Sequence, residues 1–371
     1  MKVLITGGAG FIGRKLTKEL VAQGRQVKWL DVLDPQIHGQ QPDFVELAGG
    51  AVELVVGDVS DRAMWLKSIE DVDTIYHFAA QTGTGQSMYR VAYYTDTNVG
   101  GTGLLWDVLA NEPHQVKKVV IASSRSIYGE GAYQCRANCG LVVPEPRTKV
   151  QLDQQLWDLR CPSCGGVAEP VATTEASVPQ PASLYACSKL AQEQMSITMG
   201  KALGISTIAL RFQNVFGPGQ SLSNPYTGII SIFSNQMRQN LPVNIYEDGE
   251  ETRDFVYVGD VVDACVRAAK IERGAVILNV GSGVATKVID LANLLKRLWG
   301  SESSISVSGD NRVGDIRHNW ADLTALQQAC AGWQATSLDV GLQAFVDWAR
   351  SQEVFEDKSA IAAAELKKRN L

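Results

Sequence analysis

Short apolar runs alternate with amphipathic stretches along the first third of the chain, and this alternation limits the fold more than any other feature. The apolar runs have the length and the β-branched content of strands, at residues 2–6, 26–31, 52–57, 74–78 and 118–123. Helical patterns such as 11–23 and 93–111 separate most of them, and the alternation resumes with a helix at 185–201 and a strand at 206–211. Strands that alternate with helices build βαβ units, so we predict an α/β chain with a doubly wound parallel sheet.

The connection between the first predicted strand and the first predicted helix is rich in glycine. Gly8, Gly10 and Gly13 fit the pattern G-x-G-x-x-G, in the context that a dinucleotide-binding turn requires. Glycine allows the backbone to approach a pyrophosphate, which then lies at the positive end of the helix. A loop that needs glycine only for its own conformation is the alternative.

Two acids end later strands of this pattern. Asp31 ends the second apolar run, 18 residues after Gly13, where a carboxylate binds both ribose hydroxyls and repels a 2'-phosphate. Together with the glycine turn, it favours a Rossmann-type sheet that binds NAD rather than NADP. Asp58 ends the third run and is either a contact to the adenine amino group or a plain turn residue.

Tyr185 and Lys189 are four residues apart, so on a helix they share one face. Interconversion of an alcohol and a carbonyl needs a base for the hydroxyl proton, and a free tyrosine with a pKa of ~10 is poorly ionised at neutral pH. A neighbouring ammonium and a positive nicotinamide ring would lower that pKa. A surface Tyr and Lys on an amphipathic helix are the alternative, but Ser124 also brings a hydroxyl to a strand end, where ligands collect.

The charge balance restricts the partners. The chain has 371 residues, 45% of them hydrophobic, and its 34 Lys and Arg against 40 Asp and Glu leave a net charge of -6. This balance argues against a protein that coats DNA or an anionic membrane. No apolar run reaches the ~20 residues of a membrane helix, and no signal segment precedes the first strand. We therefore expect a cytoplasmic protein without nucleic-acid or membrane partners, in which local cations and backbone N–H groups hold any anionic ligand.

The chain resembles the extended short-chain dehydrogenase/reductase family of nucleotide-sugar epimerases and dehydratases. The resemblance runs from residue 1 to about residue 348, apart from one insertion. Besides the glycine turn and the Tyr185 and Lys189 pair, it rests on the segments 77–80 (HFAA), 98–102 (NVGGT), 123–129 (SSRSIYG), 211–218 (RFQNVFGP), 253–256 (RDFV) and 312–315 (RVGD). It implies a Rossmann-type NAD-binding domain, a smaller C-terminal α/β substrate domain and a homodimer.

The resemblance also implies residue roles. Tyr185 would be the catalytic acid and base, Ser124 would hydrogen-bond the reacting sugar oxygen, and Lys189 would orient the nicotinamide ribose. Tightly bound, recycled NAD would contact Gly7, Gly10, Phe11, Ile12, Gly13, Asp31, Asp58, Val59, Ala79, Ala80, Asn98, Tyr185 and Lys189. A nucleotide-diphosphate sugar would contact Gln81, Gln86, Ser87, Ser124, Asn214, Tyr246, Arg253, Arg312 and Asp315.

Within the substrate set, Arg253 and Arg312 fall where the family binds the diphosphate, and Asp315 falls where it binds the ribose of the nucleotide. The two arginines would supply the local positive field that an acidic chain needs. Tyr246 either stacks on the base or is a half-buried strand residue.

The residues after Ser124 bear on the reaction. In the 4,6-dehydratase branch of the family an Asp and a Glu follow the active-site hydroxyl, whereas here Arg125 and Ser126 do. We therefore expect a 4-epimerase that oxidises C4, lets the keto sugar rotate and returns the hydride to the opposite face. Residues 82–87 resemble the sugar-pocket loop of 4-epimerases. A dehydratase or dehydrogenase that uses the same three residues is the alternative, and an idle sensor of NAD or nucleotide sugars is another.

Four of the seven cysteines form two close pairs with 21 residues between them. Cys135 and Cys139 are followed by Gly140, and Cys161 and Cys164 are likewise followed by a glycine, as in a four-cysteine zinc ribbon. No histidine lies in this stretch, so we predict a closed, structural zinc site. A redox disulfide pair and free thiols are the alternatives. The other three cysteines are expected to be small core residues: Cys187, Cys265 and Cys330.

The cysteine pairs lie between two predicted catalytic residues. Ser124 and Tyr185 are 61 residues apart, much more than in relatives without a ribbon, and residues 132–173 account for the difference. The insertion therefore emerges at the mouth of the site, as a lid or a dimer contact, and its four basic and four acidic side chains form no basic stripe. With segments 34–39 and 223–228, it resembles a bacterial dTDP-L-rhamnose 4-epimerase-like subgroup, which implies a dTDP-6-deoxyhexose.

The expected domain boundaries follow from these positions. The NAD-binding domain takes residues 1–131 and 174–216, with 257–284 returning to it. The zinc ribbon takes 132–173, the nucleotide-sugar domain takes 217–256 and 285–350, and a tail takes 351–371.

Overall fold

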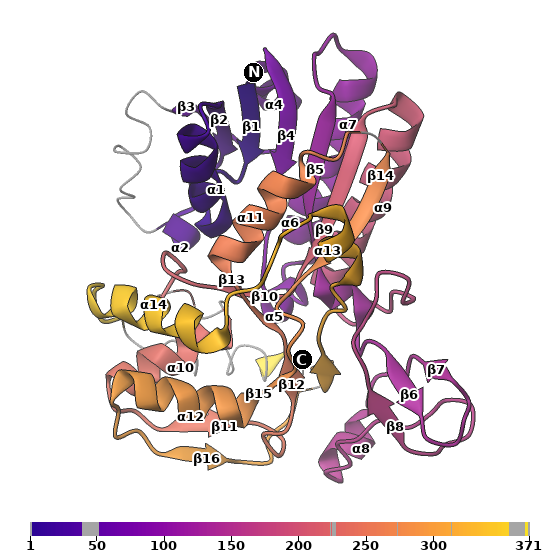
Figure 1. Cartoon of the computed structure of the whole chain (residues 1–371), viewed down its shortest axis with the longest axis vertical. Coiled ribbons are helices and arrows are strands. Elements are labelled where there is room, and N and C mark those ends of the chain that lie inside the picture. The colour runs from indigo at the N-terminus through magenta and orange to yellow at the C-terminus, as the bar shows by residue number, and fades with distance from the viewer. Residues whose placement is uncertain are drawn as a thin grey trace.

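A seven-stranded parallel sheet forms the centre of the larger lobe, with strand order β14-β9-β5-β4-β1-β2-β3 (Figure 1). The computed structural model describes residues 2–38, 52–222, 224, 228–272, 274–312, 314–355 and 368–369. The sheet consists of β1 (Lys2–Thr6), β2 (Gln26–Asp31), β3 (Val52–Val56), β4 (Val72–His77), β5 (Lys118–Ser124), β9 (Ser206–Phe212) and β14 (Ala275–Val280). The predicted doubly wound sheet is confirmed, and its topological switch point, where ligands bind in such folds, lies between β1 and β4.

Helices cover both faces of this sheet because each face is apolar. One face packs against α1 (Phe11–Ala22), α11 (Val258–Ala268) and α13 (Thr324–Ala329), and the other against α4 (Arg62–Ser68), α7 (Gly101–Asn111) and α9 (Leu184–Leu203). The first core contains Leu16, Trp29 and Val261, and the second contains Trp65 and Leu105. The sheet is therefore buried on both sides, which explains the nearly continuous apolar strands in the sequence.

The single helix expected over 93–111 is interrupted in the structure. It consists of α6 (Val91–Tyr94), a π-helical turn at Thr95–Gly100 and α7. Within the turn, the fully buried Asn98 accepts a hydrogen bond from the Gln81 backbone N–H at 2.7 Å and donates one to Ser188 Oγ at 2.9 Å. A π-helical turn inserts a residue into the helical repeat, and here it directs a polar side chain into the interior.

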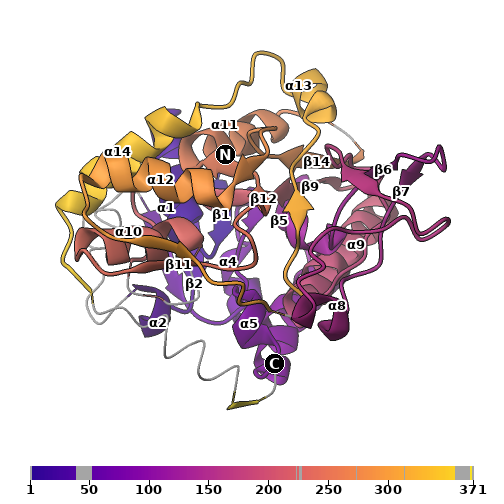
Figure 2. The ribbon, with the colours of Figure 1, turned by 90° about the horizontal axis from the view of Figure 1, so that it is seen from below.

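The smaller lobe has its own apolar core and lies below the large sheet in Figure 1, and Figure 2 shows the molecule from this side. Its elements are β10 (Asn214–Phe216), α10 (Ile229–Arg238), β11 (Val243–Ile245), β12 (Thr252–Arg253), β13 (Phe255–Tyr257), β15 (Thr286–Lys287), α12 (Val288–Trp299), β16 (Ile305–Val307), β17 (His318–Asn319) and α14 (Leu338–Arg350). Strand β12 lies between β15 and β17, and this small sheet carries Arg253. Two short helices, α2 (Pro35–His38) and α5 (Thr84–Ser87), lie beside the carboxyl ends of the large sheet.

The cysteine-containing insertion forms a separate three-stranded sheet at one side of the molecule (Figure 1). It contains β6 (Tyr133–Cys135), β7 (Leu141–Val142), α8 (Lys149–Asp153) and β8 (Ala168–Pro170). Its apolar cluster is small and consists of the buried side chains Tyr133, Leu159 and Ala168, with Val142 packed on them. So small a core needs a further constraint to hold one conformation.

The three cysteines outside the insertion differ in their exposure. Cys265 and Cys330 are buried, as expected, but Cys187 is exposed. The prediction for Cys187 is wrong because Ala186, Ser188 and Lys189 take the inward face of α9.

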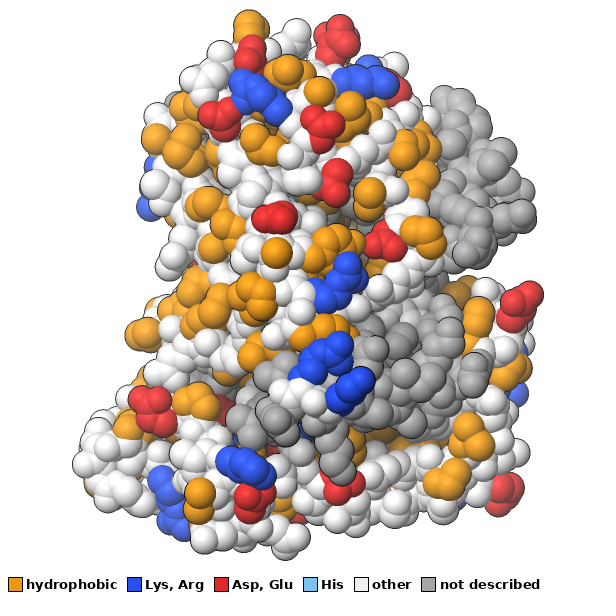
Figure 3. Space-filling view, turned by 180° about the vertical axis from the view of Figure 1, so that it is seen from behind, with side chains coloured by type: hydrophobic (Ala, Val, Ile, Leu, Met, Phe, Trp, Pro, Cys, Tyr) orange, Lys and Arg blue, Asp and Glu red, His pale blue; other side chains and the backbone are white. Residues whose placement is uncertain are grey.

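Acidic and basic side chains are interspersed over the coloured atoms of Figure 3. Within the described residues, no helix combines the length and hydropathy that crossing a membrane requires.

Some segments named above fall outside the described residues. These are Gly39, Ser223, residues 225–227 and Val313, together with most of the tail at 351–371.

The packing of the glycine turn yields a stability prediction. A Cβ on Gly13 would lie 2.5 Å from the Gly7 carbonyl oxygen and 2.7 Å from that of Gly8, and backbone atoms cannot move away cheaply. We expect Gly13→Ala to lower the free energy of unfolding by about 1–3 kcal/mol, measured by urea titration. The matched control is Gly103→Ala in α7, where a Cβ meets nothing within 4 Å, and it should raise stability by up to ~1 kcal/mol. Equal losses in the two variants would contradict this account.

Candidate functional site

A cavity of about 430 Å³ opens at the carboxyl ends of the strands, at the switch point of the sheet. The turn after β1 and the ends of β2, β4, β5 and β9 contribute to its wall, as does the start of α9. Of the residues predicted to bind the cofactor, the cavity brings together Gly7, Gly10, Phe11, Ile12, Gly13, Asp31, Asp58, Val59, Ala79, Ala80, Tyr185 and Lys189. Asn98 is the exception, since it supports the loop at Gln81 from behind.

The glycine turn has the shape of a cradle for an anion. A Cβ on Gly7 would lie 2.9 Å from the Ala79 backbone nitrogen, and one on Gly8 would lie 2.3 Å from the Trp29 ring. At Gly10, by contrast, a Cβ would approach only the Gly7 carbonyl oxygen, at 3.1 Å, so this position faces open space. Gly10 is also the N-cap of α1 and provides no side-chain cap, which leaves the first N–H groups available to a phosphate. A dinucleotide fits here.

The acid at the end of β2 is held beside this turn. One Asp31 oxygen accepts the Ala9 backbone N–H at 3.0 Å, and the other accepts the Leu33 N–H at 2.9 Å and lies 3.5 Å from His38 Nε2. The carboxylate is therefore fixed at the place where a ribose would meet it. Asp58 also lines the cavity, while its Oδ1 accepts the Ser60 backbone N–H at 2.8 Å, so it is a turn residue and a wall residue at once.

Ser124 and Tyr185 meet at the inner end of the cavity. Ser124 is the last residue of β5, and its Oγ accepts hydrogen bonds from the backbone N–H and the hydroxyl of Ser126, at 3.1 and 2.9 Å. Tyr185 lies in the first turn of α9, and its backbone N–H donates to Ser87 Oγ at 3.1 Å. Burial raises the pKa of the Tyr185 phenol, while the Ser124 hydroxyl and the charge of Arg125 act to lower it.

Lys189 lies one turn along α9 from Tyr185 and is buried. Burial lowers the pKa of Lys189 to about 7, although the Glu193 carboxylate acts to raise it. The Lys189 ammonium donates to Gln192 Oε1 at 2.8 Å, and the Gln192 amide donates to Thr102 Oγ1 at 2.7 Å. The side chain is therefore held in place but poorly solvated, which suits a residue whose charge is needed only when a cofactor is present.

Residues 78–83, between β4 and α5, form part of the cavity wall. Gln81 lines the cavity, and its amide donates to the Tyr93 hydroxyl at 2.8 Å. Gln86 and Ser87, predicted to contact the substrate, are buried and do not line the cavity. Ser87 accepts the Tyr185 N–H instead, so these two side chains support the loop from within.

Arg125 lies between Tyr185 and residues of the smaller lobe. One guanidinium nitrogen lies 3.3 Å from Asn214 Oδ1, and the other, Nη1, is buried with no hydrogen-bond partner among the described residues. Burial lowers the pKa of Arg125 to about 10; the Arg253 charge acts in the same direction, and Asp315 and Tyr185 oppose it. In the sequence, Arg125 served only to distinguish the chain from the dehydratase branch, whereas in the structure its charge lies near both Tyr185 and Arg253.

The remaining predicted substrate residues gather on the smaller lobe, outside the cavity wall. The Arg312 guanidinium lies 4.7 Å from the centre of the Tyr246 ring and 3.1 Å from its hydroxyl. Asp315 closes a turn by donating its backbone N–H to the Arg312 carbonyl at 3.2 Å. Tyr246 lies one residue beyond β11, so it is not a strand residue, and its ring is available for stacking on one face.

Residues 3–159 and 162–281 of the chain match the sequence model of the NAD dependent epimerase/dehydratase family. The chain belongs to this family. It is 38% identical over 351 residues, 94% of both chains, to dTDP-L-rhamnose 4-epimerase of Burkholderia thailandensis. It is 28% identical to UDP-glucuronate 4-epimerase 3 of Arabidopsis thaliana, over 93% of this chain and 76% of that one.

Solved structures of family members share the whole fold. UDP-glucose 4-epimerase of Thermotoga maritima, bound to UDP-glucose, has a TM-score of 0.75 at 27% identity, over 94% of this chain and 99% of that one. MoeE5, in complex with UDP-glucose and NAD, has a TM-score of 0.73 at 30% identity and the same coverage. The fold of this family member is thus one in which a relative is known to hold NAD.

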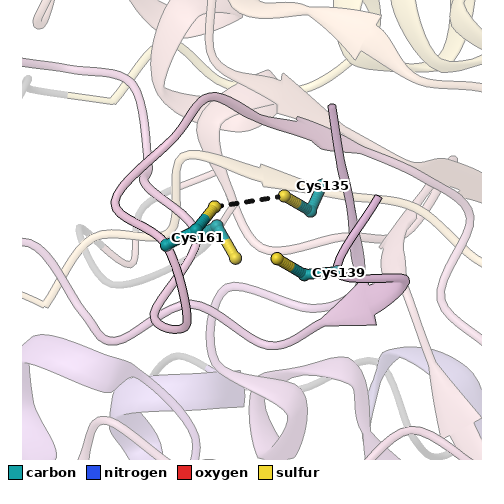
Figure 4. A group of neighbouring side chains, drawn as sticks. Cys135, Cys139 and Cys161 are labelled. Atoms are coloured by element: carbon teal, nitrogen blue, oxygen red, sulfur yellow. Dashed lines mark hydrogen bonds between the residues drawn. The ribbon is translucent and has the colours of Figure 1, made fainter. Parts of the chain in front are cut away.

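The four paired cysteines of this family member converge in the insertion. The sulfurs of Cys135, Cys139, Cys161 and Cys164 all lie within 4.8 Å of one another, and they face a common centre (Figure 4). Each pair lies in a turn closed by the same bond, from the Cys135 N–H to the Gly140 carbonyl at 3.0 Å and from the Cys161 N–H to the Gly166 carbonyl at 2.9 Å.

The thiols of this cluster are unequal. Desolvation acts to raise the pKa of Cys161, but backbone N–H groups of Ser163 and Cys164 lower it to about 6. Hydrogen bonds to the Cys164 and Cys135 sulfurs raise the pKa of Cys139 to about 12. The four thiols are thus close enough to affect one another's protonation.

Several residues of the cavity wall were not predicted from the sequence. Asp34, just before α2, lines it together with Ile37 and His38 of α2, and so do Gln213 and Gln220. The Tyr93 hydroxyl of α6 donates to Asp34 Oδ2 at 3.0 Å, which connects the start of α2 to α6. The sequence signal for α2 was the segment 34–39 that supported the subgroup resemblance, but it carried no indication that these side chains face the cofactor cavity.

Burial of Lys189 gives a pH dependence of stability. Its pKa is about 7 in the folded chain and near 10.5 in the unfolded chain, so between these values the unfolded chain binds more protons. In protein freed of dinucleotide, the free energy of unfolding of the wild type should therefore rise relative to that of Lys189→Met by up to about 1.4 kcal/mol per pH unit across this window. Urea titrations at pH 7 and pH 9.5 measure the difference. A pH-independent difference would show that the ammonium is solvated.

Proposed function

We propose that this chain is an NAD-dependent nucleotide-sugar 4-epimerase, which oxidises the C4 alcohol of a sugar, allows the keto sugar to turn over and reduces the carbonyl from its other face. The observation that carries the proposal is the meeting of Ser124, Tyr185 and Lys189 at the inner end of a dinucleotide-sized cavity. The naming of several relatives as 4-epimerases supports the same reaction.

The roles of the three side chains follow from their positions. Bound NAD supplies the hydride acceptor for the first half of the reaction and the donor for the second. Tyr185 removes the proton of the 4-hydroxyl while hydride leaves C4, and it returns that proton when the carbonyl is reduced. Ser124 hydrogen-bonds the same oxygen, and the Lys189 ammonium favours the phenolate form of Tyr185. Atoms and electrons balance over the cycle, so no cofactor is consumed.

The carboxylates of the cavity favour epimerisation over elimination of water. Elimination needs an acid and a base in addition to the tyrosine, but Arg125 and Ser126 occupy the positions next to Ser124. Among the described residues of the cavity wall, the carboxylates are Asp31, Asp34 and Asp58. They lie at or after the ends of β2 and β3, whereas Ser124 ends β5. A dehydratase is therefore the weaker alternative.

The substrate we propose is a dTDP-6-deoxyhexose. The 38% identity to a dTDP-L-rhamnose 4-epimerase over nearly the whole of both chains supports this choice. Arg253, Arg312 and Asp315 would hold the diphosphate and the ribose, and Tyr246 would stack on the base. The homodimer stays a prediction, to be measured by light scattering.

We also propose a structural zinc ion at the four cysteines. A tetrahedral ion with Zn–S bonds near 2.3 Å requires sulfur separations of about 3.8 Å, and the four sulfurs already lie within 4.8 Å of one another. The Cys135 sulfur lies 3.5 Å from the Cys164 sulfur, and these two residues belong to different pairs. This arrangement supports a shared ion over a disulfide within each pair.

The reaction is tested with a panel of dTDP-, UDP- and GDP-sugars whose products are identified by NMR. We expect a C4 epimer without net formation of NADH, and a loss of roughly 10²–10⁴-fold in rate for Tyr185→Phe. Cys187→Ser, on the exposed side of the same helix, is the control and should keep the wild-type rate. Loss of water or stoichiometric NADH would overturn the epimerase. Unchanged biological output from Tyr185→Phe would favour the idle sensor.

The metal is tested by elemental analysis of the purified chain. We expect about one zinc per chain, and Cys161→Ser should lose it because a three-sulfur shell binds zinc more weakly. Cys265→Ser, far from the cluster in a helix of the larger lobe, should keep the metal. A fully folded wild type without metal would refute the site.

A further inference from the structure

Arg147 connects the cysteine-containing insertion to the smaller lobe. It lies between the two cysteine pairs, just before α8, and its side chain is only 2% exposed. The guanidinium donates to Glu247 Oε2 at 2.7 Å and to the backbone carbonyl of Asp315 at 2.9 Å, and it lies 3.7 Å from Glu130. An arginine that leaves its own module to bind two separate segments of another lobe is a tether between them.

The partners of Arg147 form a closed network with Arg317. Arg317 Nη1 lies 3.1 Å from the same Glu247 oxygen and 2.6 Å from Asp248, and the Arg317 backbone N–H donates to Glu130 Oε2 at 2.6 Å. Glu247 also has a backbone φ of 49°, in the left-handed region that is unfavourable for a side chain of this kind. Burial of these charged side chains removes their hydration, which costs free energy. We infer that the network is retained because it fixes one arrangement of the segments that it joins.

Four of the predicted nucleotide contacts, Tyr246, Arg253, Arg312 and Asp315, are connected to this network directly or through one neighbour. Tyr246 precedes Glu247 in the chain, and Arg312 lies over the Tyr246 ring. Asp315 offers its carbonyl to Arg147.

Arg253 is attached as well, because its Nη1 donates to the Arg317 carbonyl at 3.1 Å. The network therefore lies directly under the proposed nucleotide site, although none of its charged side chains is among the residues expected to touch the nucleotide.

We propose that the insertion positions the nucleotide site: Arg147 fixes the Asp315 carbonyl and the Glu247 carboxylate, so that Tyr246, Arg312 and Asp315 face the nucleotide. The inference rests on the proposed nucleotide site, but it does not depend on which reaction follows. It gives the insertion a task in substrate binding that neither a lid nor a dimer contact would provide.

The cysteine cluster would act through Arg147. Thr148 caps α8, accepting the Gln151 N–H at 3.3 Å and donating its own N–H to Gln151 Oε1 at 2.8 Å. The turn of chain that starts at Arg147 is thus ordered locally. The apolar cluster of the insertion contains only three buried side chains, so we infer that the cysteine cluster keeps the segment between the pairs in place.

The test compares Arg147→Met with Arg136→Met. Arg136 belongs to the same insertion, but its pairing with Glu169 is exposed and is confined to the insertion. For Arg147→Met we expect KM for the nucleotide sugar and the Kd of dTDP, by calorimetry, to rise about tenfold or more, because hydrogen bonds to a charged group are lost. The turnover number, the bound NAD and the zinc content should match the wild type, and Arg136→Met should match it in every respect. Arg147→Lys should restore part of the affinity.

Hydrogen–deuterium exchange keeps the proposal testable even if Arg147→Met folds poorly. In Arg147→Lys the amides of residues 314–318 and 246–250 should exchange faster than in the wild type, while those of α1 and α9 stay protected. Unchanged exchange in these two segments, or wild-type KM and Kd in folded Arg147→Met, would overturn the proposal. Because dTDP binding and exchange need no turnover, these results are independent of the NMR assay that decides the reaction.

Discussion

The buried polar face of α9 is the constraint on which the active site depends. A helix against a parallel sheet usually presents apolar residues, but α9 turns Ser188, Lys189, Gln192, Glu193 and Ser196 inward. Each of these groups loses its hydration and must find a partner. Glu193, for example, accepts from Arg211 of β9 at 2.6 Å and from Ser123 of β5 at 2.6 Å. Since the helix is stiff, the bonds that fix Gln192 to α7 and Glu193 to the sheet also fix Tyr185 and Lys189.

The same burial sets the electrostatics of the site. Desolvation lowers the pKa of Lys189 to about 7 and raises that of Tyr185, so the protein alone disfavours the ion pair that catalysis needs. A positive nicotinamide ring would shift the phenol toward its ionised form, and Arg125 already acts in that direction. The Tyr185 phenol would therefore ionise more readily with an oxidised cofactor bound than without one.

The two lobes and the insertion divide the work of binding. The larger lobe supplies a rigid cradle, in which Gly13 and Gly8 permit the backbone and Trp29 to pack without intervening side chains. The smaller lobe carries Arg253 and Arg312, and the proposed nucleotide contacts Tyr246, Arg312 and Asp315 lie in turns outside its strands and helices. Such turns need support from elsewhere, and the charged network around Arg147 and Glu247 provides it. A module with a minimal core can serve this purpose if its own fold is fixed by a metal.

The sequence by itself determined the parallel sheet, the glycine turn with Asp31, the Tyr185 and Lys189 pair and the two cysteine pairs. These features are local: each depends on residues within a few turns of one another, or on a strand-and-helix rhythm with one common topology. Only the tertiary structure decided that Cys187 is exposed, that a π-helical turn aims Asn98 inward and that α2 lines the cavity. It alone brought Arg147 to Glu247 and Asp315, which are 100 and 168 residues away, because the pairing of distant charges depends on how lobes pack and leaves no periodic pattern in the chain.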